Sequence, residues 1–324
     1  METLLQNPVV LIAYAAPDSV CAIAQARFAA HCIEARNLPA REVIPLAKEL
    51  NPAAIVVCGG QRLDAAAIAE LPESVRLIAT ASVGFDHLDL GAARERGMLV
   101  TNTPDVLTEC TADLTMLLML GAARRAAEYL EIMRAGWRVH FLQGDLLGTR
   151  LSGKTLGIFG MGRIGRAVAT RARGFGMRVL YCNRVRLSPE LEQGAQFHAD
   201  FNAMLAHCQV LSLHAPATPE TRAIMDARRF DLMPPGAIFV NVARGSLVDE
   251  EALLAALSSG RLFAAGLDVF AKEPAFDQRL AAQRRVFLTP HMGSATSETR
   301  HAMGLRALDN VSAVLGGGRA IDPV

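Results

Sequence analysis

The sequence predicts an α/β protein built from two doubly wound parallel-sheet domains. Apolar runs of strand length alternate with helix-like segments, and this alternation resumes after a glycine-rich turn in the middle of the chain. The chain has 324 residues, which exceeds the size at which one hydrophobic core keeps growing. Two domains are therefore expected.

The first half contains strand-like runs at 9–13, 54–58, 77–80 and 99–101, separated by helix-like segments such as 20–30, 64–71 and 88–96. After the strand that precedes the glycine-rich turn, further strands are expected at 177–182, near Phe197, and at 210–213, 237–240, 263–267 and 286–288. Strands that alternate with helices form parallel sheets covered on both faces.

The join between the domains is expected near Asn102-Thr103-Pro104, because a residue before proline leaves the helical region. A long helix from about 108 to 133 follows and is apolar on nearly every face. It is either an interdomain hinge and subunit interface or an internal core helix. The last helix, 297–315, is expected to return to the first domain. Residues 1–102 with 291–324 then form one domain, and 103–290 form the other.

Composition argues against several classes of partner. The 33 basic and 32 acidic residues nearly balance, so the chain offers no basic field for nucleic acid or an anionic membrane. The six cysteines show no C-x-x-C spacing and are expected to be reduced thiols, with no disulfide and no zinc site. The most apolar stretch, 114–123, is too short to span a bilayer, and no basic region precedes the first apolar run. A cytoplasmic location is expected.

The glycine-rich turn has the pattern of a dinucleotide site. The strand TLGIF runs into Gly160-x-Gly162-x-x-Gly165, a helix-like run follows, and a second strand comes after it. The first glycine permits the turn, the second lets the backbone approach a pyrophosphate, and the third lets the helix pack on the strand. The alternative is an ordinary glycine-rich βα turn. The context favours a Rossmann-type cofactor domain, paired with a flavodoxin-like substrate domain.

The residues after the second strand favour NADP(H) over NAD(H). NAD-selective sites place a carboxylate there, whereas this chain has Asn183 followed by Arg184 and Arg186. Two arginines can bind a 2′-phosphate through charge-assisted hydrogen bonds. If both arginines are only solvated loop charges, the cofactor site is weakly selective and also accepts NAD(H).

Three polar segments follow later strands: NVARGSLVDE at 241–250, GLDVFAKEP at 266–274 and TPHMGSAT at 289–296. In this order after a glycine fingerprint, and with ASVGFDHLDL at 81–90 and TPDVLTECTADL at 103–114, they resemble the D-isomer-specific 2-hydroxyacid dehydrogenase family over essentially the whole chain. The resemblance implies that Arg244, Glu273 and His291 carry catalysis, and that the backbone N–H groups of Val83 and Gly84 hold the substrate carboxylate.

The chemistry of each side chain agrees with these roles. Arg244 has a planar donor fork that grips a keto acid and keeps its charge. His291 is the residue type that exchanges a proton near neutrality, and Glu273 can orient and charge the imidazole. Taken singly, each has an ordinary structural explanation, and their joint role rests on the resemblance. A metal site at Asp86, His87 and Asp89 is disfavoured, because FDHLDL reads as a helix start.

The resemblance also implies further cofactor contacts. Asp268 is expected to accept a hydrogen bond from the nicotinamide carboxamide, and Asp249 is better explained as a helix N-cap. The other expected contacts are Thr108, Met161, Arg163, Ile164, His214, Ala215, Pro216, Val242, Ala243 and Gly293.

Within the family, segments 105–118, MGRIG and PHMGSAT are most similar to those of glyoxylate and hydroxypyruvate reductases. Few aromatic residues lie where they would face a substrate (Phe85, Trp137 and Phe141), which favours a small acid, although the loop 137–150 either closes over the site or lies away from it. The expected activity is NADPH-dependent reduction of glyoxylate to glycolate and of hydroxypyruvate to D-glycerate. The alternatives are an NAD-dependent D-lactate or aryl-lactate dehydrogenase and a non-catalytic, cofactor-sensing regulator.

A homodimer is expected, with Thr103 and the region near Pro290 as hinges.

Overall fold

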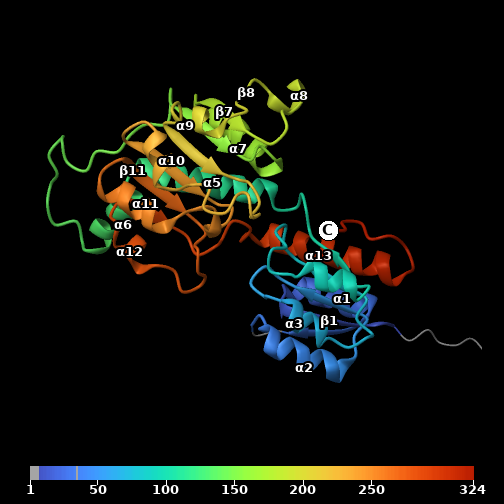
Figure 1. Cartoon of the computed structure of the whole chain (residues 1–324). Coiled ribbons are helices and arrows are strands. Elements are labelled where there is room, and N and C mark those ends of the chain that lie inside the picture. The colour runs from blue at the N-terminus through green and yellow to red at the C-terminus, as the bar shows by residue number, and fades with distance from the viewer. Residues whose placement is uncertain (1–6, 34–35) are drawn as a thin grey trace, which may run out of the picture. The chain divides into compact units, whose positions relative to one another are not determined.

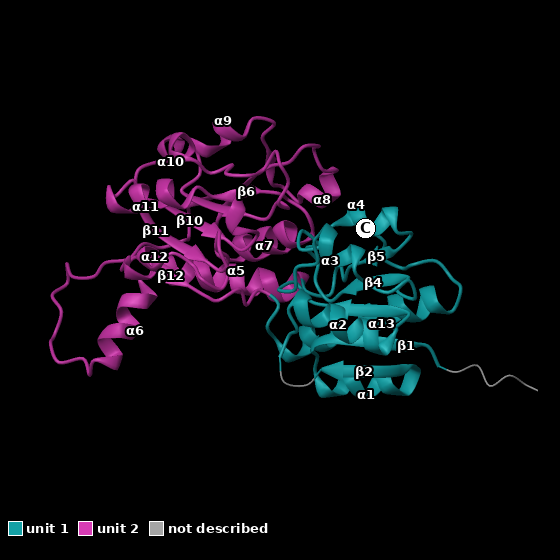
Figure 2. Cartoon of the chain, turned by 60° about the horizontal axis from the view of Figure 1, so that its bottom comes forward, with its two compact units in different colours: residues 1–107, 294–324 teal, residues 108–293 magenta. Residues whose placement is uncertain are grey.

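The computed structural model describes residues 7–33 and 36–324 and divides into two compact units (Figure 2). Unit 1 comprises Met1–Leu107 and Ser294–Val324, and unit 2 comprises Thr108–Gly293. Each unit is built around its own parallel sheet, which confirms the predicted class of two parallel-sheet α/β domains.

Unit 1 contains a five-stranded sheet in the order β2-β1-β3-β4-β5, and all of its strand pairs are parallel. The order is the flavodoxin-like one. The strands are β1 (Val9–Ala15), β2 (Ala29–Ile33), β3 (Ala54–Val57), β4 (Leu77–Thr80) and β5 (Leu99–Thr101).

The helices of unit 1 are α1 (Asp18–Arg27), α2 (Ala40–Leu50), α3 (Ala65–Ala69), α4 (Leu90–Glu95) and α13 (Ser297–Leu315). Buried side chains of α2, α3 and α4 share one apolar cluster with the sheet. α13 packs against α1 and β4 (Figure 1). A Cβ on Gly304 would lie 2.6 Å from a methyl of Val20, so glycine lets the two helices approach closely. The last helix therefore returns to the first domain, as predicted.

Unit 2 contains a seven-stranded parallel sheet in the order β12-β11-β10-β9-β6-β7-β8. This is the Rossmann order with one additional edge strand. The strands are β6 (Thr155–Phe159), β7 (Arg178–Cys182), β8 (Gln196–Phe197), β9 (Val210–Leu213), β10 (Ala237–Asn241), β11 (Leu262–Leu267) and β12 (Val286–Leu288).

Two groups of helices cover the faces of this sheet. Buried residues of α5 and α7 form one apolar cluster with it, and those of α9, α10, α11 and α12 form another. Asp249 caps α11 by accepting a hydrogen bond from Ala252 N at 3.1 Å, as predicted. The helices are α5 (Thr108–Ala123), α6 (Ala126–Arg134), α7 (Arg163–Gly174), α8 (Pro189–Glu192), α9 (Phe201–Leu205), α10 (Ala227–Leu232), the 3₁₀ helix Gly245–Leu247, α11 (Glu250–Ser258) and α12 (Gln278–Ala282).

The prediction of one continuous helix over 108–133 is wrong. α5 ends at Ala123 and α6 begins at Ala126, because Arg125 adopts a left-handed conformation with φ 56° and ψ 40°. A left-handed residue cannot continue a right-handed helix. The helix expected at 20–30 is also too long: it ends at Arg27, and Phe28 is extended and leads into β2.

The unit boundaries differ from the expected ones at 102/103 and 290/291. Thr103 stays with unit 1 because its N–H donates to Ser82 O at 3.0 Å. His291 stays with unit 2 because its N–H donates to Asp268 O at 2.8 Å. The histidine therefore belongs to the same unit as Arg244 and Glu273.

Among the described residues, no helix combines the length and the apolar character that a bilayer-crossing segment requires.

Candidate active site

The candidate residues of unit 2 lie at the carboxyl ends of its strands. Because the strands are parallel, these ends meet at one edge of the sheet. Gly160 follows β6, Asn183 follows β7 and His214 follows β9, while Val242, Asp268 and Thr289 follow β10, β11 and β12. One edge thus carries the glycine turn and the three polar segments.

The glycine turn has the backbone that its sequence predicts. Gly160 has φ +95°, and a Cβ there would lie 2.5 Å from Ala215 N. A Cβ on Gly165 would lie 2.5 Å from Gly160 O, whereas one on Gly162 would meet nothing within 4 Å. Gly162 is the N-cap of α7, and no side chain caps the helix. The first N–H groups of α7 therefore have no side-chain cap, which suits a pyrophosphate.

The three polar residues of the loop after β7 have different surroundings. Asn183 Oδ1 accepts a hydrogen bond from Met161 N at 2.6 Å and so joins this loop to the glycine turn. Arg186 donates two hydrogen bonds to Glu192, at 2.8 and 3.1 Å. Glu192 is buried and also accepts from Tyr181 Oη at 2.5 Å. Arg184 is exposed and is the arginine of this loop that is not bound to Glu192.

His214 follows β9 and is held neutral. One ring nitrogen, Nε2, lies 2.8 Å from Ser212 Oγ, while Nδ1 is buried with no hydrogen-bond partner among the described residues. Enclosure of the ring lowers the pKa of His214 to about 3. His214 precedes Ala215, whose backbone packs against Gly160. Since buried polar atoms normally have a hydrogen-bond partner, the unpartnered Nδ1 of His214 fits a polar ligand at this edge of the sheet.

Glu273 and His291 form a close pair. Glu273 Oε2 lies 2.6 Å from His291 Nδ1, and Oε1 accepts from Phe270 N at 2.9 Å. Burial alone would raise the pKa of Glu273, but the hydrogen bonds from His291 and Phe270 N and the charges of His291 and Arg244 together lower it below its ordinary value. The carboxylate stays ionised and fixes the imidazole through Nδ1. Nε2 is then the ring nitrogen left for proton transfer.

Asp268 organises the turn that carries His291. Its carboxylate accepts from Thr289 Oγ1 at 2.6 Å, Met292 N at 2.7 Å and Gly293 N at 2.8 Å. His291 has φ 55°, an unfavourable conformation for a residue other than glycine. Burial raises the pKa of Asp268 despite these bonds. The carboxylate predicted to bind the nicotinamide thus also holds the histidine's backbone.

Two residues at this edge escaped the sequence analysis. Asn241 Nδ2 donates to Arg244 O at 2.9 Å, and its Oδ1 accepts from Ala243 N at 3.0 Å, so its buried amide fixes the turn that carries the arginine. A Cβ on Gly245 would lie 1.9 Å from the carbonyl carbon of Phe270. Glycine therefore lets the Arg244 segment pass close to the segment of Glu273. Both residues could have been identified from the sequence, because they flank Arg244 in the segment NVARGS.

Arg244 lies in the loop after β10, and the remaining predicted contacts of unit 2 lie in loops that follow strands or at the starts of α5 and α7. Arg244 Nη1 donates to Ala243 O at 2.7 Å. Thr108 begins α5, and Thr111 of that helix donates to Gly293 O at 3.1 Å. Pro216 follows Ala215, and its carbonyl accepts from Thr221 Oγ1 at 2.8 Å. Arg163 and Ile164 begin α7.

The predicted substrate loop lies in unit 1. Asn102 Nδ2 donates to Val83 O at 2.8 Å, and Ser82 Oγ donates to Gly84 O at 2.6 Å. Among the described residues, none accepts a hydrogen bond from the N–H of Val83 or of Gly84. The carbonyls of the loop are fixed, and these two N–H groups remain able to donate.

Comparisons with known proteins agree with this geometry. Residues 116–293 match the model of the D-isomer specific 2-hydroxyacid dehydrogenase NAD binding domain. The chain is 42% identical over 282 residues to a glycerate dehydrogenase of Hyphomicrobium methylovorum, covering 85% of this chain and 86% of that protein. It is 39% identical over 313 residues to a glyoxylate/hydroxypyruvate reductase B of Shigella boydii, covering 96% of each.

A solved structure shares the fold. The NADPH-dependent glyoxylate/hydroxypyruvate reductase of Sinorhizobium meliloti, crystallised with NADP and malonate, superposes with a TM-score of 0.87. It is 32% identical, and the match covers 98% of this chain and 97% of that one.

We expect Asp268→Ala to loosen the turn that carries His291. The substitution leaves the N–H groups of Met292 and Gly293 without their acceptor, and for the buried N–H of Gly293 the cost is about 1–3 kcal/mol. The urea-unfolding midpoint should fall, and hydrogen exchange at both amides should accelerate. Asp249→Ala is the control: loss of that N-cap costs about 1 kcal/mol and should leave exchange at these amides unchanged. Full protection of the two amides in Asp268→Ala would contradict the assigned role.

Proposed function

Because this chain belongs to the D-isomer-specific 2-hydroxyacid dehydrogenase family, we propose that it reduces glyoxylate to glycolate and hydroxypyruvate to D-glycerate, with NADPH as the preferred reductant. The observation that carries the proposal is the 2.6 Å pair of Glu273 and His291, which shares a sheet edge with Arg244 and the glycine turn. The names of the relatives point to the same small acids.

Each catalytic group has one task in the proposed reaction. The guanidinium of Arg244 binds the keto acid, and the N–H groups of Val83 and Gly84 bind its carboxylate. His291 Nε2 donates a proton to the carbonyl oxygen as the alkoxide develops, and Glu273 stabilises the imidazolium and fixes the ring. The nicotinamide, when bound, supplies the hydride.

The cofactor site suits a dinucleotide. The uncapped start of α7, with Met161, Arg163 and Ile164 beside the glycines, would hold the pyrophosphate. Asn183 would border the adenine ribose, and Thr108 with the loop His214-Ala215-Pro216 would border the phosphates and the second ribose. Val242, Ala243, Asp268 and Gly293 would line the nicotinamide end.

The preference for NADPH rests on the loop after β7. A carboxylate at this loop would repel a 2′-phosphate, and Asn183 stands in its place. Arg184 is exposed, whereas Arg186 is bound to Glu192. We therefore assign the direct phosphate contact chiefly to Arg184, with Arg186 shaping the loop. The Sinorhizobium relative is described as NADPH-dependent.

The substrate preference rests on size and on the relatives. The three aromatic side chains considered for the substrate, Phe85, Trp137 and Phe141, are all exposed, so none of the three forms a buried wall that would favour an aryl pyruvate. A cytoplasmic location is proposed from the reduced cysteines and the balanced charge.

Homodimer formation is proposed from an apolar arm. We use this name for α6 and the segment that follows it to Gly148, which projects from the rest of unit 2 (Figure 2). Its side chains Met133, Trp137 and Leu142 are 59, 55 and 78% exposed. Tyr129 donates to Leu146 O at 2.8 Å, which holds the segment against α6. So many exposed apolar groups on an ordered projection are typical of a subunit interface.

The proposed activity predicts fast oxidation of NADPH with glyoxylate and hydroxypyruvate, followed by loss of absorbance at the reduced-nicotinamide band. Pyruvate, phenylpyruvate and NADH serve as comparisons. His291→Ala should lower kcat by about 10²–10⁴-fold, because it removes the proton donor, and should leave the Kd for NADPH within about twofold. Turnover only with NADH or a bulky acid would support the lactate-type alternative. No turnover with any pair would support the cofactor-sensing regulator.

The cofactor assignment predicts that Arg184→Ala lowers the ratio of kcat/KM for NADPH to that for NADH. Loss of a charge-assisted hydrogen bond to phosphate corresponds to about tenfold or more. Arg228→Ala, which removes an exposed arginine of α10, is the control and should leave the ratio unchanged. An unchanged ratio in Arg184→Ala would refute the assignment.

The arm predicts a dimer in sedimentation equilibrium, with twice the chain mass of 34.7 kDa. Met133→Glu combined with Leu142→Glu should yield monomers, since charges would have to be buried at the interface. Phe175→Glu places a charge on an exposed apolar residue outside the arm and should leave the dimer intact. A monomeric wild-type protein would rule the interface out.

A further inference from the structure

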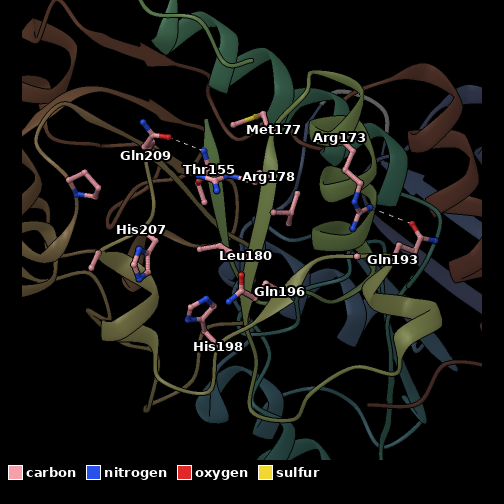
Figure 3. Close-up of a pocket in the computed structure, with 14 residues that line it drawn as sticks. Thr155, Arg173, Met177, Arg178, Leu180, Gln193, Gln196, His198, His207 and Gln209 are labelled. Atoms are coloured by element: carbon pink, nitrogen blue, oxygen red, sulfur yellow. Dashed lines mark hydrogen bonds between the residues drawn. The ribbon is translucent and has the colours of Figure 1, made fainter. Parts of the chain in front are cut away.

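A groove lies at the opposite edge of the seven-stranded sheet from the candidate active site. It has a volume of about 860 Å³ and is lined by Thr155 at the start of β6, Arg178 at the start of β7 and Gln196 in β8 (Figure 3). These are the amino ends of parallel strands. No residue assigned above to catalysis or to the cofactor lines the groove.

Arg178, Gln196 and His207 lie on the face of the sheet that α9 covers, whereas Arg173 extends from α7 on the other face. Arg178 and Leu180 lie on the same face because successive strand residues alternate, and Leu180 is in register with Gln196. Leu180 shares an apolar cluster with residues of α9. Figure 3 shows Gln196 and His207 beside Leu180, and Gln209 beside Thr155. Arg173 and Gln193 lie together at another part of the groove.

The groove is positively charged. No aspartate or glutamate lines it. Arg178 donates to the hydroxyl of Thr155 at 3.0 Å, and none of the carboxylates that the structure describes forms an ion pair with it. Gln209 Oε1 accepts from Thr155 N at 3.1 Å, which leaves the amide NH₂ of Gln209 available to donate. The exposed His207 follows α9. Donors converge here without an acidic partner.

We propose that this groove binds a small organic anion through a carboxylate or phosphate group, with Arg178 as the charged contact and Gln196, Gln209 and His207 as hydrogen-bond donors. A guanidinium fork matches either oxyanion bidentately. Leu180 and Pro234, which also line the groove, supply apolar surface for the organic part. Small-molecule sites commonly combine apolar lining with a few polar groups that fix orientation. The proposal does not depend on the proposed function.

The test must separate this groove from the other anion sites. Arg184, at the far end of β7, and Arg244 also attract anions, so bulk binding alone is not diagnostic. The reporter is the imidazole C–H signal of His207 in ¹H–¹³C NMR spectra, assigned with His207→Asn. The full chain, saturated with NADPH, is titrated with inorganic phosphate and separately with succinate, at constant ionic strength.

We expect a saturable shift of the His207 signal with phosphate, with succinate or with both, and the responding probe identifies the preferred oxyanion. Arg178→Gln should weaken binding by about tenfold or more, and Arg228→Gln, at an exposed position of α10 that does not line the groove, should leave it within about twofold. Gln196→Glu, at an exposed position, should abolish binding by adding a negative charge, and it provides the test if Arg178→Gln does not fold. The proposal fails if neither probe gives a saturable shift, or if binding survives both substitutions in folded protein.

Discussion

The candidate active site depends on the buried carboxyl group of Asp268. Its backbone N–H bonds to Asn241 O at the end of β10, and its backbone carbonyl accepts from His291 N. Its side chain holds Thr289, Met292 and Gly293. One residue at the end of β11 therefore ties the ends of both neighbouring strands together. The left-handed backbone of His291 is tolerated because the chain on both sides of it is fixed.

A second constraint keeps the arginine and carboxylate segments close. Gly245 has no side chain where the backbone of Phe270 passes, and Phe270 N holds the carboxylate of Glu273. Asn241 fixes the turn on the other side of Arg244. Backbone packing and buried amide groups thus position Arg244, Glu273 and His291, in addition to the contact between Glu273 and His291.

Most of the fold was predictable because strand and helix patterns are local. The alternation of apolar runs located the interior strands, and Asp249 marked the start of α11. The errors arose where a single backbone conformation overrode the pattern. Nothing in the apolar periodicity of 108–133 requires Arg125 to be left-handed, and β2 takes its conformation from pairing with β1. Both outcomes depend on tertiary contacts that no local window contains.

The positions of Gly160, Arg244 and His291 after the carboxyl ends of strands were predictable from their motifs. The hydrogen-bond partners of individual side chains were not predictable. The sequence gives no sign that Arg186 binds Glu192, because that pairing needs the loop to fold back over Tyr181. The sequence also gives no sign of the partners of Asp268, whose carboxylate accepts hydrogen bonds from the turn that carries His291.

The hydrogen bonds of Arg186 to Glu192 constrain any exchange of the loop after β7 that is designed to test the proposed cofactor preference. Glu192 is buried, and its negative charge is satisfied by Arg186 and the hydroxyl of Tyr181. Replacing the whole segment 183–186 with that of an NADH-using enzyme would strand this carboxylate without its counterion, so the graft would lose solubility or stability for a reason unrelated to cofactor binding. Substitution of Arg184 alone would alter the proposed phosphate contact and keep the ion pair of Arg186 with Glu192.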